Sequence, residues 1–417
     1  MLEVDAPADG PWAPLRLPVY RALWIAGLVS NIGTFMHLVA AGWAMTLVTD
    51  SDLLVSLVQT SWAVPGFLLA LHAGAFADMI DRRRLIILTQ VAALVVAGSM
   101  GVLQILDQMP PSALLAGTFL QSVALTLAAP AFMALTPELV GPRRLSQALG
   151  LDSISRNIAQ ALGPAVAGLV IALSGPGAVF LLDAASFIAV VVAVRGYRPA
   201  PRAASAPQAL AAVIRDGVRH VARAVALRRL AIRLALMSGV SSSLAALLPV
   251  VATKRLGVGS AGFGMLAAAL GLGSVMAVWV LPRLRAVARP ERTVFLAALV
   301  WSLGVALLVV GDRLWSAVVA MVLAGAGSMG TMNVLFSTYT VQLEEWMRGR
   351  GSAIAMLMVW LGASIGAVVW GATADAVGVR AALLVATVVN IVVALVARGL
   401  LHITTAPALV DVDGASA

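Results

Sequence analysis

Between two long apolar runs the chain reads Gly74-Ala-Phe-Ala-Asp78-Met-Ile-Asp81-Arg82-Arg83-Arg84. Residues 53–76 before this stretch and 84–106 after it are almost free of charge. A run of this length crosses the ~30 Å hydrocarbon core of a bilayer as a helix. The charged stretch is therefore predicted to be a short loop between two membrane-spanning helices, and the same alternation continues along the chain.

The composition agrees with a protein that crosses a membrane many times. Of the 417 residues, 61% are hydrophobic and only 11% are charged, whereas soluble domains have ~25% charged residues. The net charge of +9 does not indicate a nucleic-acid partner, because the basic residues gather in alternate loops, which is a topology signal. The chain has no Cys, and no two of its four His lie at metal-ligand spacing, so we expect no metal and no cofactor.

Twelve spans are predicted, six on each side of a polar linker. The fold class is therefore an all-α membrane protein with 12 transmembrane helices in two pseudo-symmetric six-helix halves. The predicted spans are 19–48, 53–76, 84–106, 113–136, 147–173, 178–195, 228–252, 261–281, 293–310, 315–340, 352–371 and 380–401. The units are an N-terminal tail 1–18, a half 19–195, a linker 196–227, a half 228–401 and a C-terminal tail 402–417.

The basic residues predict the orientation. Only four of the 28, Lys254, Arg255, Arg313 and Arg380, fall in the odd-numbered loops, and the remaining 24 fall on the other side or at the helix ends beside it. Loops rich in Lys and Arg stay in the cytoplasm. We therefore expect both termini in the cytoplasm. Abundant Arg, Ala and Val with a single Lys favour a GC-rich bacterial source, and so the bacterial inner membrane.

The linker carries apolar residues at helical spacing, with Arg elsewhere around the turn. The apolar residues are Leu210, Ile214, Val218, Val221 and Val225. One interpretation is a solvated connecting helix. We favour a helix on the inner membrane surface, with its Arg near anionic headgroups.

The two halves share a short repeat. Leu162-Gly-Pro-Ala-Val-Ala-Gly168 in span 5 corresponds to Leu361-Gly-Ala-Ser-Ile-Gly-Ala367 in span 11, and each follows a basic loop. Two six-helix halves with a long inner linker are the layout of a transporter whose halves rock about a central site.

The charged stretch at 74–84 resembles the signature loop of the major facilitator superfamily, G-x-L-A-D-R-x-G-R-K/R, in the same place between spans 2 and 3. Met79 and Asp81 depart from that signature at its first Arg and its second Gly. Span 1, with Gly33-Thr-Phe-Met36 and Ala41-Gly-Trp43, resembles the branch that includes the enterobactin exporter and macrolide-efflux proteins. The likeness extends over residues 17 to 401, and it implies the major facilitator fold.

The resemblance implies a conformational latch made of Gly74, Asp78, Arg82 and Arg83. In the family this cluster holds the outward-facing form together at the inner surface. Gly74 lets span 2 approach a neighbouring helix closely, and Asp78 could cap a helix or pair with Arg across the halves. The alternative is that the Arg residues only fix the topology.

Span 5 contains Gly163, Pro164 and Gly168, which are similar to the G-P-x-x-G-G signature of the superfamily's antiporters. A Gly-Pro pair removes a helix hydrogen bond and permits a kink. The resemblance implies that this antiporter-like kink shapes the cavity and prevents leak in an exporter. The alternative is an incidental bend that neighbouring helices tolerate.

Few ionisable residues lie within the spans, and each is a candidate for proton coupling because such groups are costly in a membrane. Asp183 lies in span 6 with no cation nearby in sequence, and His37 lies in span 1. Asp152 and Arg156 share a face of span 5, where a structural ion pair is the favoured interpretation. Span 4 lacks the Arg that proton antiporters of the superfamily often have.

Polar side chains on the spans expected to face the central cavity are candidate lining residues. They are Ser30, Asn31, Thr34, Gln121, Ser241, Asn333 and Ser337. The rest of these spans is Met, Val, Leu and Trp, which suits a bulky, largely apolar substrate. Plain helix packing is the alternative for the Ser residues.

The function predicted is secondary active export of small amphipathic molecules, such as a drug, a siderophore or another natural product, in exchange for protons. The expected partners are the substrate, protons and the lipid bilayer, and we expect a monomer. A nutrient importer of the same fold and a non-transporting receptor are the alternatives. The sequence lacks a P-loop, paired His and Cys, so neither a membrane enzyme nor an ATP-driven pump is expected.

Overall fold

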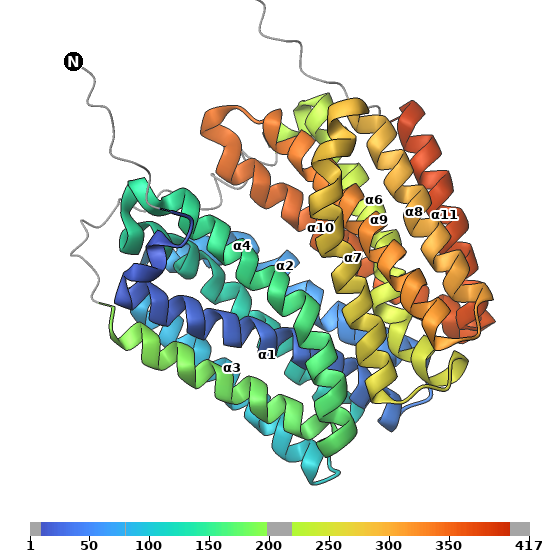
Figure 1. Cartoon of the computed structure of the whole chain (residues 1–417), viewed down its shortest axis with the longest axis horizontal. Coiled ribbons are helices and arrows are strands. Elements are labelled where there is room, and N and C mark those ends of the chain that lie inside the picture. Colours follow the sequence, from blue (N-terminus) through green and yellow to red (C-terminus); the bar gives the residue numbers. More distant parts are fainter. Residues whose placement is uncertain (1–9, 80, 198–218, 401–417) are drawn as a thin grey trace, which may run out of the picture.

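The computed structural model describes residues 10–79, 81–197 and 219–400, which are almost entirely helical (Figure 1). Helices α1–α4 form one bundle and α6–α11 form a second bundle beside it. The predicted surface helix of the linker falls mainly on residues 198–218, outside the described part.

The first bundle begins with a short 3-10 helix, η1 (Ala13–Arg16), and contains four long helices. These are α1 (Pro18–Val48), α2 (Asp52–Met79), α3 (Arg82–Ile105) and α4 (Pro111–Arg195).

The second bundle contains six long helices, with a π-helix and a 3-10 helix between them. In chain order these are α6 (Val225–Val250), the π-helix η2 (Val251–Arg255), α7 (Ser260–Val287), α8 (Pro290–Val310), α9 (Leu314–Val341), η3 (Glu345–Met347), α10 (Arg348–Val377) and α11 (Val379–Leu400).

Helix α4 is one element of 85 residues, far too long for a single crossing. It is broken at Gly141 and Gly175, whose φ angles are +71° and +77°, a backbone conformation that glycine adopts at little cost. A proline follows each of these glycines, and Pro is well suited to the first position of the next helical part. The chain reverses at both breaks (Figure 1).

The breaks explain how the observed helices relate to the predicted spans. Ten helices of the described chain are long and apolar enough to cross a membrane, with α4 counted once. The predicted spans 113–136, 147–173 and 178–195 coincide with its three parts. The all-helical membrane fold is confirmed, and the number of twelve crossings stays a prediction.

The surface of the bundles is apolar, as a lipid-facing surface must be. Large side chains such as Leu173, Val310 and Trp279 are more than 70% exposed. Many side chains buried between the helices are Ala, which lets the helices approach closely. Packing between helices here depends on small residues and close contact, because lipid supplies no hydrophobic drive for helices to associate.

The halves meet along two seams. In one, α4 touches α7, where a methyl group added at Gly168 would lie 2.7 Å from the Cα atom of Gly264. In the other, α2 touches α10, where a methyl group added at Gly66 would lie 3.1 Å from the ring of Trp360. These glycines bring helices of opposite halves into direct contact.

Candidate transport site

A cavity of about 160 Å³ lies between the halves. Its walls come from α1, α2 and α4 on one side and from α6 and α7 on the other. Seventeen residues line it: Phe35, Leu38, Val39, Gly42, Val55, Val58, Gln59, Gln160, Pro164, Ala245, Ala246, Leu248, Pro249, Phe263, Ala267, Leu270 and Gly271. All are apolar except the two glutamines, so the cavity suits an apolar group with a few polar contacts.

A buried acid–base cluster lies within the first half. The Asp183 carboxylate is fully buried, with the His37 Nδ1 atom 3.1 Å from its Oδ2 atom. The Gln121 amide donates a hydrogen bond of 3.1 Å to the same oxygen. Both partners are also fully buried. The three side chains come from α1 and from the first and third parts of α4, so the cluster joins three predicted spans.

Close packing holds this cluster in place. A methyl group added at Gly33 of α1 would lie 2.7 Å from Asp183 Oδ1 and 3.0 Å from Ser186 Oγ. The His37 ring meets Phe180 edge to face, with 4.9 Å between ring centres. Asp183 Oδ1 and both ring nitrogens of His37 form no hydrogen bond in the described chain, so the Nδ1–Oδ2 approach is a close contact without hydrogen-bond geometry. A carboxyl and an imidazole that are both fully buried are costly to charge separately, so the protonation of this pair decides the charge of the cluster.

Asp152 belongs to a different set of contacts. It accepts hydrogen bonds from the Tyr20 hydroxyl at 3.4 Å and the Thr136 hydroxyl at 3.5 Å. Arg156 is exposed, and within the described chain it makes no ion pair with Asp152. The ion pair favoured from the spacing is not closed to contact distance here, because Asp152 bonds to α1 and the first part of α4, although the Arg156 charge still acts on Asp152.

None of the seven predicted lining residues is among those that line the cavity. Asn31 donates to Ser155 at 3.1 Å, and Gln121 belongs to the Asp183 cluster. Asn333 and Ser337 each accept a 2.9 Å hydrogen bond from Arg285. The other three are Ser30, which is buried, and Thr34 and Ser241, which are half-buried.

The antiporter-like residues of span 5 lie at helix contacts. A methyl group added at Gly163 would lie 2.6 Å from the Cβ atom of Phe35 in α1, within the same half. Pro164 lines the cavity, and Gly168 touches Gly264 of the other half. The backbone remains helical at Pro164, since only Gly141 and Gly175 leave helical geometry in α4.

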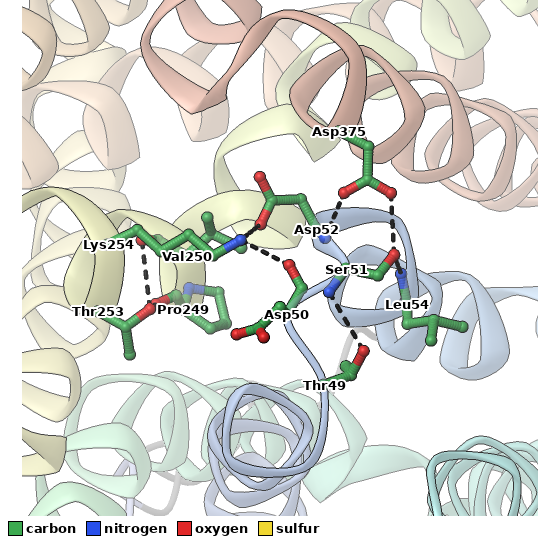
Figure 2. A network of polar contacts seen from close by, with 10 residues as sticks. All are labelled: Thr49, Asp50, Ser51, Asp52, Leu54, Pro249, Val250, Thr253, Lys254 and Asp375. Carbon is green, nitrogen blue, oxygen red and sulfur yellow. Dashed lines mark hydrogen bonds and ion pairs between the residues drawn. The ribbon is translucent and has the colours of Figure 1, made fainter.

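A charged network joins the halves at the end of the bundle that holds residues 49–52, here called the Asp50 end (Figure 2). The Lys254 ammonium pairs with Asp52 and donates to the Asp50 carbonyl at 2.6 Å. Asp375 of α10 accepts from the Asp52 backbone N–H at 2.6 Å and from the Ser51 hydroxyl at 2.9 Å.

Helix α2 is thus capped by a residue of the opposite half. The first N–H groups of a helix lack partners within it and attract a carboxylate. Asp375 supplies that carboxylate from near the C-terminus of α10, where a negative charge is otherwise unfavourable. The π-helix η2 carries Lys254 at the end of α6, and π-helical turns often occur at functional sites.

At the opposite end, called the Arg82 end after the first residue of α3, the charged contacts between described residues lie within each half. Arg82 pairs with Glu138, and Arg83 donates to the Arg195 carbonyl at 3.2 Å. In the second half Arg233 forms a bidentate ion pair with Glu291, at 2.7 and 2.8 Å.

Tyr197 completes the contact at Glu138. Its hydroxyl donates to the Glu138 carboxylate. Burial and this carboxylate raise the pKa of Tyr197 to about 12, so the phenol stays protonated and keeps donating.

The predicted latch lies at the Arg82 end, and Arg82 and Arg83 are the two of its four residues whose side chains are described. Gly74 and Asp78 fall in α2, and their side chains lie outside the described residues. The described contacts of Arg82 and Arg83 are with their own half. Every hydrogen bond or ion pair that joins described residues of different halves involves Lys254, Asp375 or the Thr60–Ser364 contact.

Sequence reasoning overlooked Asp52, Lys254, Asp375, Gln59 and Gln160. One signal was available for the first two, since the single Lys of the chain and a pair of Asp lie in loops expected on the same side. Asp375 shares that signal, since it lies in another loop expected on the same side. The glutamines gave none, because each is one polar residue at a helix position that could face any neighbour.

The fold agrees with comparisons to known proteins. The model of the transmembrane secretion effector family matches residues 9–411. The staphyloferrin A transporter of Staphylococcus aureus is 24% identical over 332 residues, which are 78% of this chain and 82% of that protein. The chain belongs to the transmembrane secretion effector family of the major facilitator superfamily, and it is a transporter rather than an enzyme.

Solved structures support the fold. A bacterial homologue of the human lysosomal transporter Spinster, in an inward-facing and unoccupied conformation, has a TM-score of 0.74 and 14% identity, covering 92% of this chain and 96% of that one. The nucleoside transporter NupG has a TM-score of 0.74 and 12% identity, covering 91% and 98%. At these identities the likeness shows the fold alone.

Proposed function

We propose that this protein is a secondary active transporter of the bacterial inner membrane that exports small amphipathic molecules in exchange for protons. The observation that carries the proposal is the buried Asp183–His37–Gln121 cluster. Burial of an ionisable group within a membrane protein is energetically costly, and such groups are therefore usually functional. A carboxyl that contacts an imidazole offers two adjacent groups that can each bind a proton.

Two observations favour export over import. The span 5 residues Gly163, Pro164 and Gly168 resemble the antiporter signature, and two of them lie at the cavity or at the contact between halves. The matching family model is described as a secretion effector. A siderophore is one candidate substrate, since a relative is named as a staphyloferrin A transporter. Drugs and other natural products are further candidates.

The proposed cycle is alternating access. We assign the Asp50 end to the outer face, because the loops at the Arg82 end carry most of the basic residues. The structure is then closed to the outside by the network of Lys254, Asp52 and Asp375. In the opposite state this network separates, and the latch of Gly74, Asp78, Arg82 and Arg83 closes the inner end.

Transport of a lipophilic cationic dye into proteoliposomes, with and without an imposed pH gradient, tests the proposal. In the wild type we expect the dye to move in the direction opposite to the protons. In Asp183→Asn we expect the gradient-driven transport rate to fall at least tenfold. Asp107→Asn is the matched control, because Asp107 is an exposed carboxylate in the turn between α3 and α4. That variant should transport like the wild type.

Three outcomes would contradict the proposal. Full gradient-driven transport by Asp183→Asn would remove the cluster from proton coupling. Dye movement in the same direction as the protons would favour the importer alternative. The absence of transport across dyes, siderophores and antibiotics would favour a non-transporting receptor.

A further inference from the structure

We infer that the cavity between the halves recognises an uncharged hydrogen-bonding group, such as an amide, attached to an aromatic or aliphatic body, and that Gln59 and Gln160 determine this specificity. The inference rests on the proposed function, because it names the part of the substrate that the central cavity binds. It concerns only the portion of a substrate that enters this cavity.

The first argument is the absence of charge among the cavity residues. Each of the seventeen lining residues is neutral. A charged group placed there would lose its hydration without gaining an ion-pair partner, which is strongly unfavourable. The Asp183 cluster is not part of the lining, so it offers no counter-charge to a ligand in the cavity.

The second argument is the state of the two carboxamides. Gln59 of α2 and Gln160 of α4 are both half-buried, and neither forms a hydrogen bond within the described chain. A carboxamide has two N–H donors and a carbonyl acceptor. An amide or an alcohol on the ligand could therefore both donate to and accept from this pair.

The third argument is size. A dry cavity of about 150 Å³ is large enough to bind benzene, and this one has about 160 Å³. One ring or a short branched chain fills it. Phe35 of the first half and Phe263 of the second half are both in the lining, so a ring bound there lies between aromatic side chains of the two halves.

The position of the glutamines also connects recognition to movement. Gln59 and Gln160 both belong to the first half, whereas Leu248, Pro249 and Phe263 belong to the second. A ligand that fills the cavity touches both halves at once. Its affinity must then differ between the two states of the transporter, which is the condition for a ligand to shift their populations.

Binding of four benzene derivatives to the purified full-length protein in detergent tests this inference without any gradient. The probes are benzamide, toluene, benzoate and benzylamine, and the readout is the ligand-induced rise in unfolding temperature at increasing concentration, which yields an apparent Kd. We expect benzamide to bind at least fivefold more tightly than each of the other three.

The variants Gln59→Leu and Gln160→Leu should each weaken benzamide binding at least fivefold and change toluene binding less than twofold. Gln160→Asn, which keeps the amide but shortens the side chain, should weaken benzamide alone. Gln108→Leu, at an exposed position at the Asp50 end, is the matched control and should bind all four probes like the wild type.

Equal binding of benzamide and benzoate by the wild type would overturn the inference, as would unchanged benzamide binding in both leucine variants or failure of every probe to bind. Asp183→Asn separates this inference from the proposed function. It should retain the benzamide preference while losing gradient-driven transport. Loss of the preference in Asp183→Asn alone would also overturn the assignment to the glutamines.

Discussion

The two ends of the bundle use charge in different ways. At the Asp50 end Lys254 and Asp375 reach from the second half to the first, and the Lys254 side chain is 46% exposed. At the Arg82 end the ion pair of Arg233 and Glu291 stays within one half, and the Arg233 side chain is fully buried. The Lys254 ammonium therefore reaches solvent although its partner Asp52 is buried, whereas both side chains of the Arg233–Glu291 pair are largely out of solvent.

This difference follows from what each contact has to do. A contact between halves must break and re-form in every transport cycle, so it must be weak, and exposed ion pairs contribute only ~0–1 kcal/mol. A contact within a half must survive the whole cycle. A buried bidentate Arg–carboxylate pair is hard to break, because removing one partner leaves the other charge without compensation. The partly exposed Lys254 contact is the candidate gate, and the buried Arg233–Glu291 pair belongs to the scaffold of the second half.

The largest expected effect is on the scaffold. Arg233→Met should destabilise the second half by ~3–5 kcal/mol, because it removes a bidentate ion pair from a largely buried site. Thermal or denaturant unfolding in detergent measures it. Arg255→Met is the control, since the partner of Arg255 at the Asp50 end, Asp312, is 84% exposed. Equal stability of the two variants would contradict the distinction between a buried and an exposed ion pair within this half.

The next effect is on the seam between α4 and α7. A side chain at Gly264 would meet the backbone of Gly168 and Pro164 at 2.6 and 2.7 Å, and overpacking of this kind costs ~1–3 kcal/mol. Gly264→Val should therefore favour the state that is open at the Asp50 end, while each half stays folded.

A single Cys measures this opening, because the chain contains none. Ala245→Cys in the cavity should react with a membrane-impermeant maleimide added to intact cells at least tenfold faster in the Gly264→Val background. Gly27→Val serves as the control, since nothing lies near a Cβ atom at Gly27. Slow labelling in both backgrounds would mean that this seam does not hold the end closed.

The smallest effect is on the gate itself. Lys254→Met or Asp375→Asn should each shift the balance by ~1 kcal/mol toward the state open at the Asp50 end, which is about a fivefold gain in labelling of Ala245→Cys. High salt should give a similar gain in the wild type, because it screens the exposed pair. Asp312→Asn is matched in charge and location but acts within one half, so it should change nothing. An equal gain in Asp312→Asn would contradict a role for contacts between halves.

Much of the architecture could be predicted, because it depends on local properties of the chain. Apolar length alone predicts the spans, and the breaks of α4 occur at Gly-Pro pairs next to the predicted span ends. Asp183 and His37 were each predicted as candidates, since an ionisable residue within a span is conspicuous in a sequence. The observed distance between them was not predictable, because it depends on how α1 packs against the third part of α4.

The cavity lining was the least predictable feature. The polar residues of spans 1, 4, 7 and 10 were expected to face it, but Asn31, Gln121 and Asn333 are engaged with neighbouring helices instead. A polar side chain in a membrane protein first satisfies its own hydrogen bonds, and which neighbour it meets depends on helix rotation. Helix rotation also places Gln59 and Gln160 at the cavity. That rotation is not encoded in the local sequence pattern.

Paired distance measurements at both ends test the central claim, that the halves alternate between closure at the Asp50 end and closure at the Arg82 end. Spin labels at Gln108→Cys and Arg313→Cys report on the Asp50 end, and labels at Ser146→Cys and Gly349→Cys report on the Arg82 end; all four positions are exposed. In the background of Lys254→Met with Asp375→Asn, we predict a longer distance at the Asp50 end and a shorter one at the Arg82 end. The same fraction of molecules should show each change. Distances that change at one end only, or that lengthen at both, would contradict the account.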